Sequence, residues 1–373
     1  MADPYSLFVS TFNCGKLLPA DDPAAIQAVI SALLPVGKPH DVYVLGFQEL
    51  TVIWQGSFAD IVQQTLQKVA RYVLEHLNAQ NIGRRYEIAA LNSSGAIGIL
   101  ALVATELSVL SIFKTNAKCG MLYSSLKGAA ALQLTLQRAG SALSDSFVFV
   151  TAHLTANEGE EQRLKREEDY HTVVAALQRD FGSFVNHHVF ICGDFNFRAQ
   201  KWALNADDFR NPLLVRRAAI EHDELNLSRA AGRIFHNFEE PPVEFAPTYK
   251  FMLTSPDEQY NTIRIPSWCD RVLFRRYHST PHILSYKSRK RCAALQFTDH
   301  LPVSLEVIVP HLEFEQAVSA QNWSESPQWS AELIGSATDT LIGYSGLASD
   351  RYGRQLTFAA LMMVLWVLYQ LFT

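Results

Sequence analysis

The chain has 373 residues, of which 48% are hydrophobic and 18% charged, and its formal net charge is −5 at pH 7. These values are typical of a globular protein with one large core, and the acidic balance argues against a protein that wraps duplex nucleic acid with a broad basic face. The five cysteines form no C-x-x-C pair, so neither a zinc cage nor a disulfide scaffold is predicted, and a reducing compartment is expected.

Up to about residue 300, strand-like and helix-like segments alternate along the chain. Buried strands are predicted at residues 6–13, 41–50, 97–104, 130–136, 147–154, 188–197, 271–274 and 303–309. Helices with apolar residues three and four apart are predicted at residues 24–34, 58–77 and 160–181. Because the strands follow no strict strand–helix–strand repeat, the pattern favours an α/β (α+β) fold of two packed sheets with outer helices. The sequence contains no glycine-rich pattern typical of a nucleotide-binding loop.

The composition changes after Pro310, so residues 1–312 are interpreted as one main domain. Residues 313–355 mix Ser, Gly and acidic residues and are predicted to form a tether, with a short amphipathic helix near residues 331–341. Residues 356–373 contain no charged side chain, and the apolar run spans roughly 25 Å as a helix. We expect a transmembrane tail anchor here, with a buried terminal helix as the alternative.

The flanking residues predict how such an anchor would be oriented. Arg351 and Arg354 precede it, which favours a catalytic domain in the cytosol. The amino terminus lacks the basic start and apolar run of a secretory signal, which agrees with this orientation. The short span favours the endoplasmic reticulum over a thicker membrane.

Polar side chains stand at the ends of several predicted strands, where each alone would be interpreted as a turn or cap residue. They are Asn13, Glu49, His153, Asp194, Asn196, Asp270, Asp299 and His300. Their coincidence indicates a hydrolase site. Oxygen ligands such as Glu49, Asn13 and Asp299 suit Mg²⁺, which binds through one or two carboxylates together with waters and a substrate phosphate.

The remaining residues of this set match the needs of phosphate ester hydrolysis. Asp194 is expected to orient and deprotonate a water, and Asn196 to donate a hydrogen bond to the phosphoryl oxygens as they gain negative charge. His300, held by a carboxylate such as Asp270, would stabilise a phosphoryl oxygen as an imidazolium.

Two longer motifs carry a family resemblance. FICGDFNFR at 190–198 resembles the element W-x-G-D-x-N-[FY]-R, and RIPSWCDRVLF at 264–274 resembles R-x-P-[SA]-W-C-D-R-[IV]-L. Supporting stretches are FQEL at 47–50, TAHLTANEGEEQRLKREEDY at 151–170, APTYKF at 246–251, LSYKS at 284–288 and TDHLPV at 298–303. From about Leu7 to Val309, the chain therefore resembles the inositol polyphosphate 5-phosphatases of the endonuclease/exonuclease/phosphatase superfamily.

The resemblance implies a DNase I-like four-layer sandwich, in which two packed mixed β-sheets are flanked by helices. It also implies Mg²⁺-dependent removal of the 5-phosphate by in-line attack of water. The substrate would be a phosphoinositide such as phosphatidylinositol 4,5-bisphosphate or a soluble inositol polyphosphate, and the sequence leaves open which of the two.

By motif position, the resemblance assigns the roles given above and adds five residues. His153 would contact the scissile phosphate. Arg271 is counted among the substrate-binding residues and would support the acidic network nearby. Tyr249 and Lys250 fall where family members hold the neighbouring 4-phosphate, and Lys127 is kept in the loop SLKG at 125–128.

The chain departs from the family pattern at three places. Asn157, which is also predicted to bind substrate, stands where a second His is usual, and Thr262 stands where a Lys that contacts the 4-phosphate is common. The loop SLKG at 125–128 lacks the Asn that the family loop carries. The apolar residues Met121, Leu122 and Tyr123 lie close to this region in the sequence and either pack in the core or favour a lipid headgroup at the substrate mouth.

Three other functions remain open at this point. They are a nuclease of the same superfamily, a sphingomyelin phosphodiesterase, and a catalytically silent binding module attached to a membrane. The acidic balance argues against nucleic acid as a partner, a membrane is the expected partner of the C-terminal helix, and no protein partner is indicated.

Overall fold

The structure is a computed structural model that describes residues 3–80, 83–200, 208, 211–261, 263–277, 281–312 and 329–372. Within these ranges, the side chains of residues 186, 212, 329 and 354–372 are not described.

Twelve strands of the described chain form two sheets of six. The first sheet has the order β11-β12-β1-β2-β4-β3, and its strands are β1 (Tyr5–Asn13), β2 (Val42–Gln48), β3 (Tyr86–Ser94), β4 (Ile97–Ala104), β11 (His282–Ser288) and β12 (Val303–Val309). β1 and β2 are parallel and the other neighbours antiparallel, so the sheet is mixed.

The second sheet has the order β5-β6-β7-β8-β10-β9. Its strands are β5 (Leu107–Lys118), β6 (Gly128–Arg138), β7 (Ser144–His153), β8 (His188–Asp194), β9 (Phe238–Glu239) and β10 (Asp270–Arg275). β7 and β8 are its parallel pair, and the remaining pairs are antiparallel. Each sheet thus contains one parallel pair whose carboxyl ends lie next to each other.

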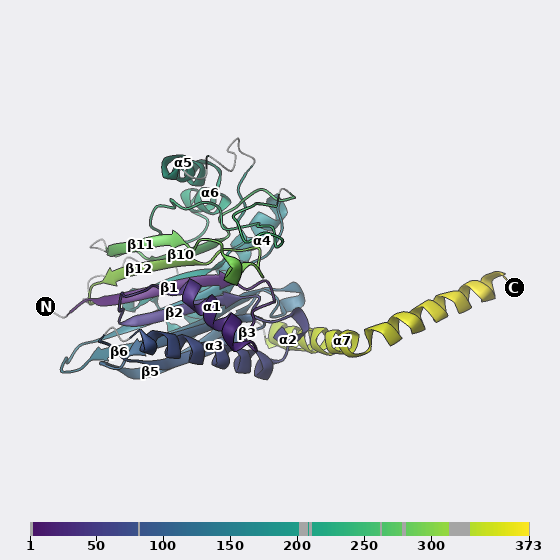
Figure 1. Ribbon diagram of the computed structural model, residues 1–373, viewed down its shortest axis with the longest axis horizontal. Helices are drawn as coiled ribbons and strands as arrows, with labels where there is room; N and C mark the ends of the chain where they lie inside the picture. The colour runs from purple at the N-terminus through teal and green to yellow at the C-terminus, as the bar shows by residue number, and fades with distance from the viewer. Residues whose placement is uncertain are drawn as a thin grey trace.

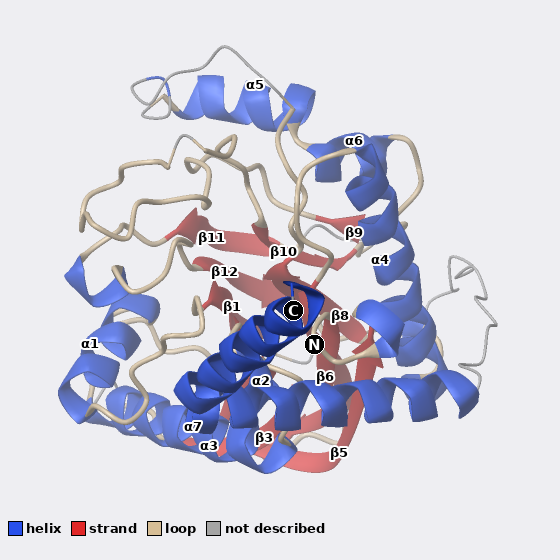
Figure 2. Ribbon diagram, turned by 90° about the vertical axis from the view of Figure 1, so that its right-hand side faces the viewer, coloured by secondary structure: helices blue, strands red, loops and turns tan. Residues whose placement is uncertain are grey.

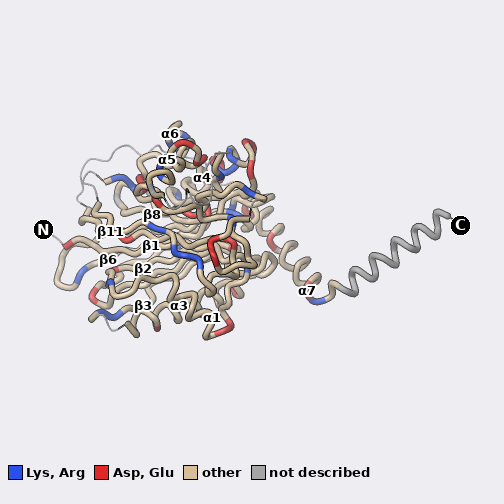
Figure 3. The backbone as a smooth tube through the Cα atoms, turned by 45° about the horizontal axis from the view of Figure 1, so that its top comes forward, with Lys and Arg blue, Asp and Glu red and all other residues tan. Residues whose placement is uncertain are grey.

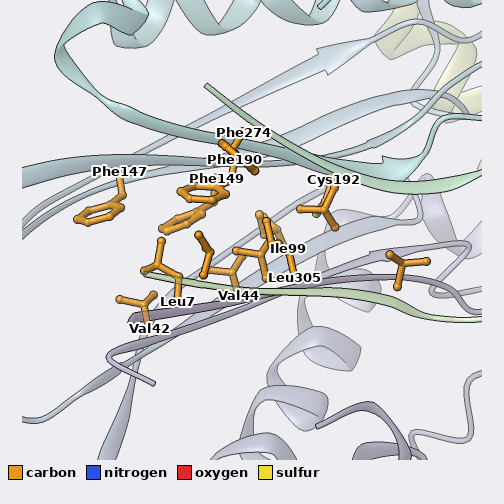
Figure 4. Close-up of a cluster of buried hydrophobic side chains, with 14 of the residues drawn as sticks. Leu7, Val42, Val44, Ile99, Phe147, Phe149, Phe190, Cys192, Phe274 and Leu305 are labelled. Atoms are coloured by element: carbon orange, nitrogen blue, oxygen red, sulfur yellow. The ribbon is translucent and has the colours of Figure 1, made fainter. Parts of the chain in front are cut away.

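The main hydrophobic core lies between the two sheets (Figure 4). Leu7 and Val44 from the first sheet face Phe149 and Phe190 from the second, and all four side chains are buried. Burying such side chains contributes roughly 1.5–3 kcal/mol each, which is the main force that holds the sheets together.

Helices cover the outer faces of the sheets and complete the four layers (Figures 1 and 2). α1 (Pro23–Leu33) and α3 (Ala59–Ala79) pack on the first sheet, and α4 (Glu160–Phe181) packs on the second. The other α-helices described before residue 312 are α2 (Ile53–Gly56), α5 (Pro212–His222) and α6 (Glu224–Ala230). α1 begins where the sequence predicts, because Asp22 accepts hydrogen bonds from the Ala24 and Ala25 amides and Pro23 stands in the first turn. The predicted four-layer sandwich of two mixed sheets is confirmed.

The C-terminal helix α7 (Trp329–Phe372) differs from the predicted tether. Residues 313–328 lie outside the described part of the chain, but from Trp329 onward the backbone is helical instead of forming one short helix near residues 331–341. The first part of α7 packs against α2 and against the 3-10 turn η1 (Met121–Tyr123). Figure 1 shows this contact at the end of the sandwich opposite the chain's amino terminus.

Among the described residues, no helix contains a stretch long and apolar enough to cross a membrane. The predicted anchor at residues 356–373 lies outside the residues whose side chains are described.

Candidate active site

The site forms where strand ends from both sheets meet. In the second sheet, the strand register places Asp194 at the end of β8 beside His153 at the end of β7 and beside Asp270 at the start of β10. Asn13 ends β1 in the first sheet, and its Nδ2 donates a hydrogen bond of 2.8 Å to Asp194 Oδ2. This bond joins the two sheets at the centre of the site.

Asp194 is the residue to which the other groups converge. Its Oδ2 lies 3.4 Å from His153 Nε2 and 3.8 Å from His300 Nε2, and its Oδ1 accepts the backbone N–H of Asn196 at 3.0 Å. Burial would raise the pKa of Asp194, but the nearby positive charges of His300 and Lys127 outweigh this effect and lower the pKa to about 2. The carboxylate is therefore ionised at neutral pH.

His300 is held by a carboxylate, as the sequence predicts. Its Nδ1 lies 2.9 Å from Asp270 Oδ2, and Thr248 Oγ1 donates to the same oxygen at 2.7 Å. Burial alone would lower the pKa of His300, but the negative charges of Asp270 and Asp194 raise it to about 9. His300 is therefore an imidazolium at neutral pH, and the Tyr249 ring packs beside it with ring centres 4.6 Å apart.

His153, in contrast to His300, is a neutral imidazole at neutral pH. Burial, together with the positive charge of Lys127, lowers its pKa well below the usual value. The Lys127 ammonium is hydrogen-bonded to His153 Nε2, and burial lowers the pKa of Lys127 to about 8 against the opposing pull of Asp194 and Glu49. Lys127 thus brings a positive charge close to the centre of the site.

Glu49 and Asn196 both have left-handed backbone angles, with φ of 48° and 57°. Such conformations in non-glycine residues are disfavoured by roughly 1–3 kcal/mol and cluster at functional sites. Glu49 lies 4.0 Å from His153 Nε2 and is paired with Lys16 at 3.3 Å. The Asn196 side-chain amide donates to the Leu154 carbonyl at 3.1 Å, which fixes its orientation beside Asp194.

Lys250 and Asp299 form the rim of the site. Lys250 Nζ lies 3.0 Å from Asp299 Oδ2, and Asp299 Oδ1 lies 3.9 Å from His300 Nε2. Burial would raise the pKa of Asp299, but His300 and Lys250 lower it. Both rim residues remain partly accessible to solvent.

Arg198 is a site residue that the sequence interpretation missed. Its Nη2 donates to Asn196 Oδ1, and its guanidinium lies over the Tyr249 ring at 4.4 Å. Its Nε and Nη1 are buried and have no hydrogen-bond partner among the described residues. The sequence could have predicted Arg198 as a site residue, because it is the last residue of the FICGDFNFR motif.

The prediction that Arg271 binds substrate is wrong. Consecutive residues of a strand point to opposite faces, so Asp270 enters the site while Arg271 points away from it. Arg271 is fully buried, with its Nη1 at 2.7 Å from Asp223 Oδ2 and its Nε at 2.6 Å from Glu240 Oε1. The acidic network that it supports is structural and separate from the site.

The structure does not bring Asn157 into this group of residues either. Asn157 is exposed, and its side-chain oxygen lies 3.5 Å from Arg264 Nη2. Its role in substrate binding stays a prediction, and Thr262 lies outside the described residues. The apolar residues Met121, Leu122 and Tyr123 are 71%, 60% and 53% exposed, so they do not pack in the core.

The donor atoms at the site fit a hard divalent cation. Ligand atoms of Asp194, Asp270 and His300 lie within 4.8 Å of one another, but Asp270 and His300 already bind each other. The carboxylates of Glu49 and Asp194 and the amide of Asn13 supply oxygen atoms of the kind that Mg²⁺ or Ca²⁺ prefers. Asp270 Oδ1 is also buried without a partner among the described residues.

A two-sheet sandwich with an ionised Asp, an imidazolium and oxygen ligands at its strand ends defines the class of the endonuclease/exonuclease/phosphatase proteins. The sequence profile of Endonuclease/Exonuclease/phosphatase family 2 matches residues 10–306. The chain belongs to this family.

Curated relatives are named as phosphoinositide 5-phosphatases. The phosphatidylinositol 4,5-bisphosphate 5-phosphatase INP51 of Saccharomyces cerevisiae is 29% identical over 80% of this chain and 30% of its own length. The human phosphatidylinositol 3,4,5-trisphosphate 5-phosphatase 1 is 26% identical over 81% of this chain and 26% of its own. The chain thus spans less than a third of the length of these relatives.

Solved structures support the fold. The inositol polyphosphate 5-phosphatase domain of SPsynaptojanin, in complex with inositol (1,4)-bisphosphate and calcium, has a TM-score of 0.63 and 22% identity over 96% of this chain and 93% of that one. Cimex nitrophorin in its ferrous NO complex has a TM-score of 0.58 and 17% identity over 83% and 99%. Since a phosphatase domain and a nitrophorin share this fold, the function has to be argued from the site.

Proposed function

We propose that the protein is a Mg²⁺-dependent phosphatase that removes the 5-phosphate from phosphoinositides such as phosphatidylinositol 4,5-bisphosphate, and that soluble inositol polyphosphates are a second substrate class. The observation that carries the proposal is the convergence of Asn13, His153 and His300 on the ionised Asp194. The names of the relatives support the substrate class.

The cation is assigned to Glu49, Asn13 and Asp299, with Asp194 next to them. When bound there, Mg²⁺ would withdraw negative charge from the phosphoryl oxygens. Glu49 and Asp299 are partly accessible to solvent, so both could bind a cation while substrate is present. Asp299 would then bind the cation in place of Lys250.

The side chains of this chain would carry out the remaining steps. Asp194 accepts a proton from the attacking water, whose oxygen forms a bond to phosphorus while the bond to the ring oxygen breaks in line. His300, kept protonated by Asp270, and the Asn196 amide stabilise the phosphoryl oxygens as negative charge develops on them. The ring oxygen leaves and takes a proton from solvent water to become the alcohol, and Asp194 later returns its proton to the solvent.

Cationic side chains around the centre would hold the phosphates of the substrate. Lys127 and Arg198 lie beside Asp194 and suit the scissile phosphate, while Lys250 with Tyr249 suits the neighbouring 4-phosphate. His153 contacts the same phosphate as Lys127 in this assignment.

Phosphate release across a panel of inositides, with and without Mg²⁺, tests the proposal. We expect release from phosphatidylinositol 4,5-bisphosphate that depends on Mg²⁺ and is lost in Asp194→Ala. Cleavage of DNA, or release of phosphocholine from sphingomyelin, without release of phosphate would overturn the proposal in favour of the other superfamily activities. In the view of Figure 3, basic and acidic segments lie interspersed, which does not favour a track for a nucleic acid backbone.

A catalytically silent binding module is the remaining alternative. Such a protein should have lost at least one catalytic group, whereas Glu49, Asp194, Asn196, Asp270 and His300 are all present. Binding of inositide vesicles without turnover by the unmodified chain would favour this alternative.

We further propose that residues 356–373 anchor the protein in a membrane, most simply that of the endoplasmic reticulum, with the catalytic domain in the cytosol. The uncharged apolar run in the sequence supports this. Deleting these residues should move the protein from the membrane fraction to the cytosol, and a truncated protein that stays in the membrane fraction would refute the anchor.

A further inference from the structure

The docked part of α7 presents a closely fitting face to the catalytic domain. Along this face, positions three or four apart carry glycine or a short acidic side chain, and these residues are Gly335, Asp339, Gly343 and Gly346. A Cβ atom on Gly335 would overlap the backbone oxygen of Tyr123, and one on Gly346 would overlap Trp54 Cβ. The helix can therefore lie this close to η1 and α2 only because these positions lack side chains.

Asp339 makes the polar contacts of this interface. Its Oδ2 lies 2.8 Å from Lys118 Nζ, and its Oδ1 accepts hydrogen bonds from Ser125 N at 2.8 Å and Ser125 Oγ at 3.0 Å. Asp339 is buried in the interface. Hydrogen bonds to an ionised carboxylate are about twice as strong as neutral ones, so Asp339 holds Ser125 firmly.

Ser125 belongs to the loop that carries Lys127 into the site. This loop, residues 119–127, is closed at its base by a 2.8 Å hydrogen bond from Cys119 N to Lys127 O. Its tip contains left-handed backbone angles at Leu122 and Tyr123, with φ of 51° and 58°. Such angles are disfavoured in non-glycine residues. Hydrogen bonds within the loop, from Gly120 N to Ser124 O at 3.0 Å and from Ser124 N to Met121 O at 3.1 Å, support this shape, and the contacts of Asp339 to Ser125 add support from outside the loop.

The end of the loop meets the catalytic centre. Lys127, two residues after Ser125, is hydrogen-bonded to His153 beside Asp194. Asp339 on α7 is thus linked through its hydrogen bonds to Ser125, and through the backbone from Ser125 to Lys127, to the residues that would bind the scissile phosphate.

We propose that Asp339 is a positioning residue of the active site: it holds loop 119–127 so that Lys127 reaches the scissile phosphate, and this makes the docked part of α7 a functional component of the catalytic domain. The inference rests on the proposed phosphatase function. It assigns to the C-terminal helix a role in substrate turnover that is separate from any role in membrane attachment.

The test uses the full chain and a water-soluble dioctanoyl phosphatidylinositol 4,5-bisphosphate with Mg²⁺, so that delivery of the membrane lipid does not enter the measurement. Asp339→Ala removes both contacts, whereas Asp339→Asn keeps an oxygen that Ser125 can bind but loses the charge that Lys118 needs. Asp350→Ala, an exposed residue on the same helix, is the matched control. We expect kcat/KM to fall about tenfold in Asp339→Ala, less in Asp339→Asn, and about twofold or less in the control.

A double-mutant cycle with Lys127→Met separates positioning from a general loss of stability. If Asp339 acts through Lys127, Asp339→Ala should change kcat/KM by about twofold or less once Lys127 is already lost. An equal tenfold loss in both backgrounds would overturn the proposal, as would unchanged kinetics of Asp339→Ala in an active parent.

Hydrogen exchange gives a readout that does not depend on activity. Amides of residues 119–127 should exchange faster in Asp339→Ala than in the parent or in Asp350→Ala, while β7 and β8 stay equally protected. A parent that releases no phosphate would refute the proposed function, whereas unchanged exchange in this loop would refute the positioning by Asp339. If Asp339→Ala does not fold, the same two measurements on Asp339→Asn decide.

Discussion

Asp194 is the residue on which the proposed chemistry depends most directly. Asp194→Asn keeps the size of the side chain and an oxygen that Asn13 can bind, but removes the group that accepts the proton of water. We expect kcat to fall by about 10²- to 10⁴-fold, the usual contribution of a general base. Steady-state phosphate release measures this, with thermal unfolding as the control for an intact fold. A variant with near-parental kcat would show that another group activates the water.

The charge states at the site predict a loss of activity at alkaline pH. His300, with its pKa raised to about 9, and Lys127, with its pKa lowered to about 8, carry the positive charge that the phosphate needs, and both lose it as the pH rises through these values. Asp194 stays ionised above its pKa of about 2 and therefore gives no loss at neutral pH.

Asp270→Asn tests which group sets this alkaline limit. The Asp270 carboxylate stabilises the imidazolium of His300, so removing its charge lowers the pKa of His300. The alkaline fall in kcat/KM, recorded from about pH 6 to about pH 10, should move to lower pH. A limit that does not move would show that Lys127, whose pKa of about 8 lies below that of His300, sets the alkaline limit instead of His300.

Some of these residues could be predicted from the sequence and others could not. Polar residues next to strand ends predicted that Asn13, Asp194 and His300 would meet, and they do meet because the ends of β1 and β8 and the segment before β12 lie at the same edge of the two packed sheets. The wrong prediction for Arg271 came from its position in the motif, whereas its place on β10, directly after Asp270, makes its side chain point to the opposite face. Asp339 could not be predicted, since its partners lie more than two hundred residues earlier in the chain.

At the scale of elements, the two faces of β10 carry residues with different roles. Asp270 faces the active site, whereas Arg271 faces a buried acidic network that stabilises the fold. Arg271→Met leaves Asp223 buried without its cation and leaves Glu240 with Arg229 as its remaining cation, and breaking a buried pair in this way destabilises by about 3–5 kcal/mol. Arg276→Ala, which breaks a largely exposed pair with Glu239, should change the free energy of unfolding by less than about 1 kcal/mol.

Chemical denaturation of both variants measures this difference. The kcat of folded Arg271→Met should stay near that of the parent, because the side chain does not face the site. A stable Arg271→Met variant with a large loss of kcat would contradict the assignment of Arg271 to a structural network.

The accuracy of the element predictions follows from burial. Strands buried on both faces, such as β2 and β8, are continuous apolar runs and were predicted, whereas β3 and β5 have partly exposed faces and mixed sequences and were missed. Residues 313–355, which include the first part of α7, were interpreted as a tether because they mix Ser, Gly and acidic residues with only weak periodicity. Glycine also has low helix propensity. At Gly335, Gly343 and Gly346, the missing side chain is what allows close packing, so tertiary contact outweighs propensity.

At the scale of the whole molecule, truncation of the chain before or after the docked part of α7 should affect kcat/KM differently. A protein ending at residue 353 keeps Asp339 and the docked part of α7, so its kcat/KM for the soluble substrate should equal that of the full chain. A protein ending at residue 312 loses these contacts, and its kcat/KM should fall at least as far as that of Asp339→Ala. Side-by-side kinetics of the two proteins check this, and equal values would contradict a functional role of α7.

The hydrogen bond from Asn13 to Asp194 joins residues 181 positions apart, one from each sheet. Contacts of such long sequence separation form late in folding, because the intervening chain must be closed into a loop first. A nascent or partly folded intermediate with one sheet in place would hold only half of the catalytic groups and would be unable to hydrolyse substrate. The time at which turnover appears during refolding therefore reports when the two sheets pack against each other.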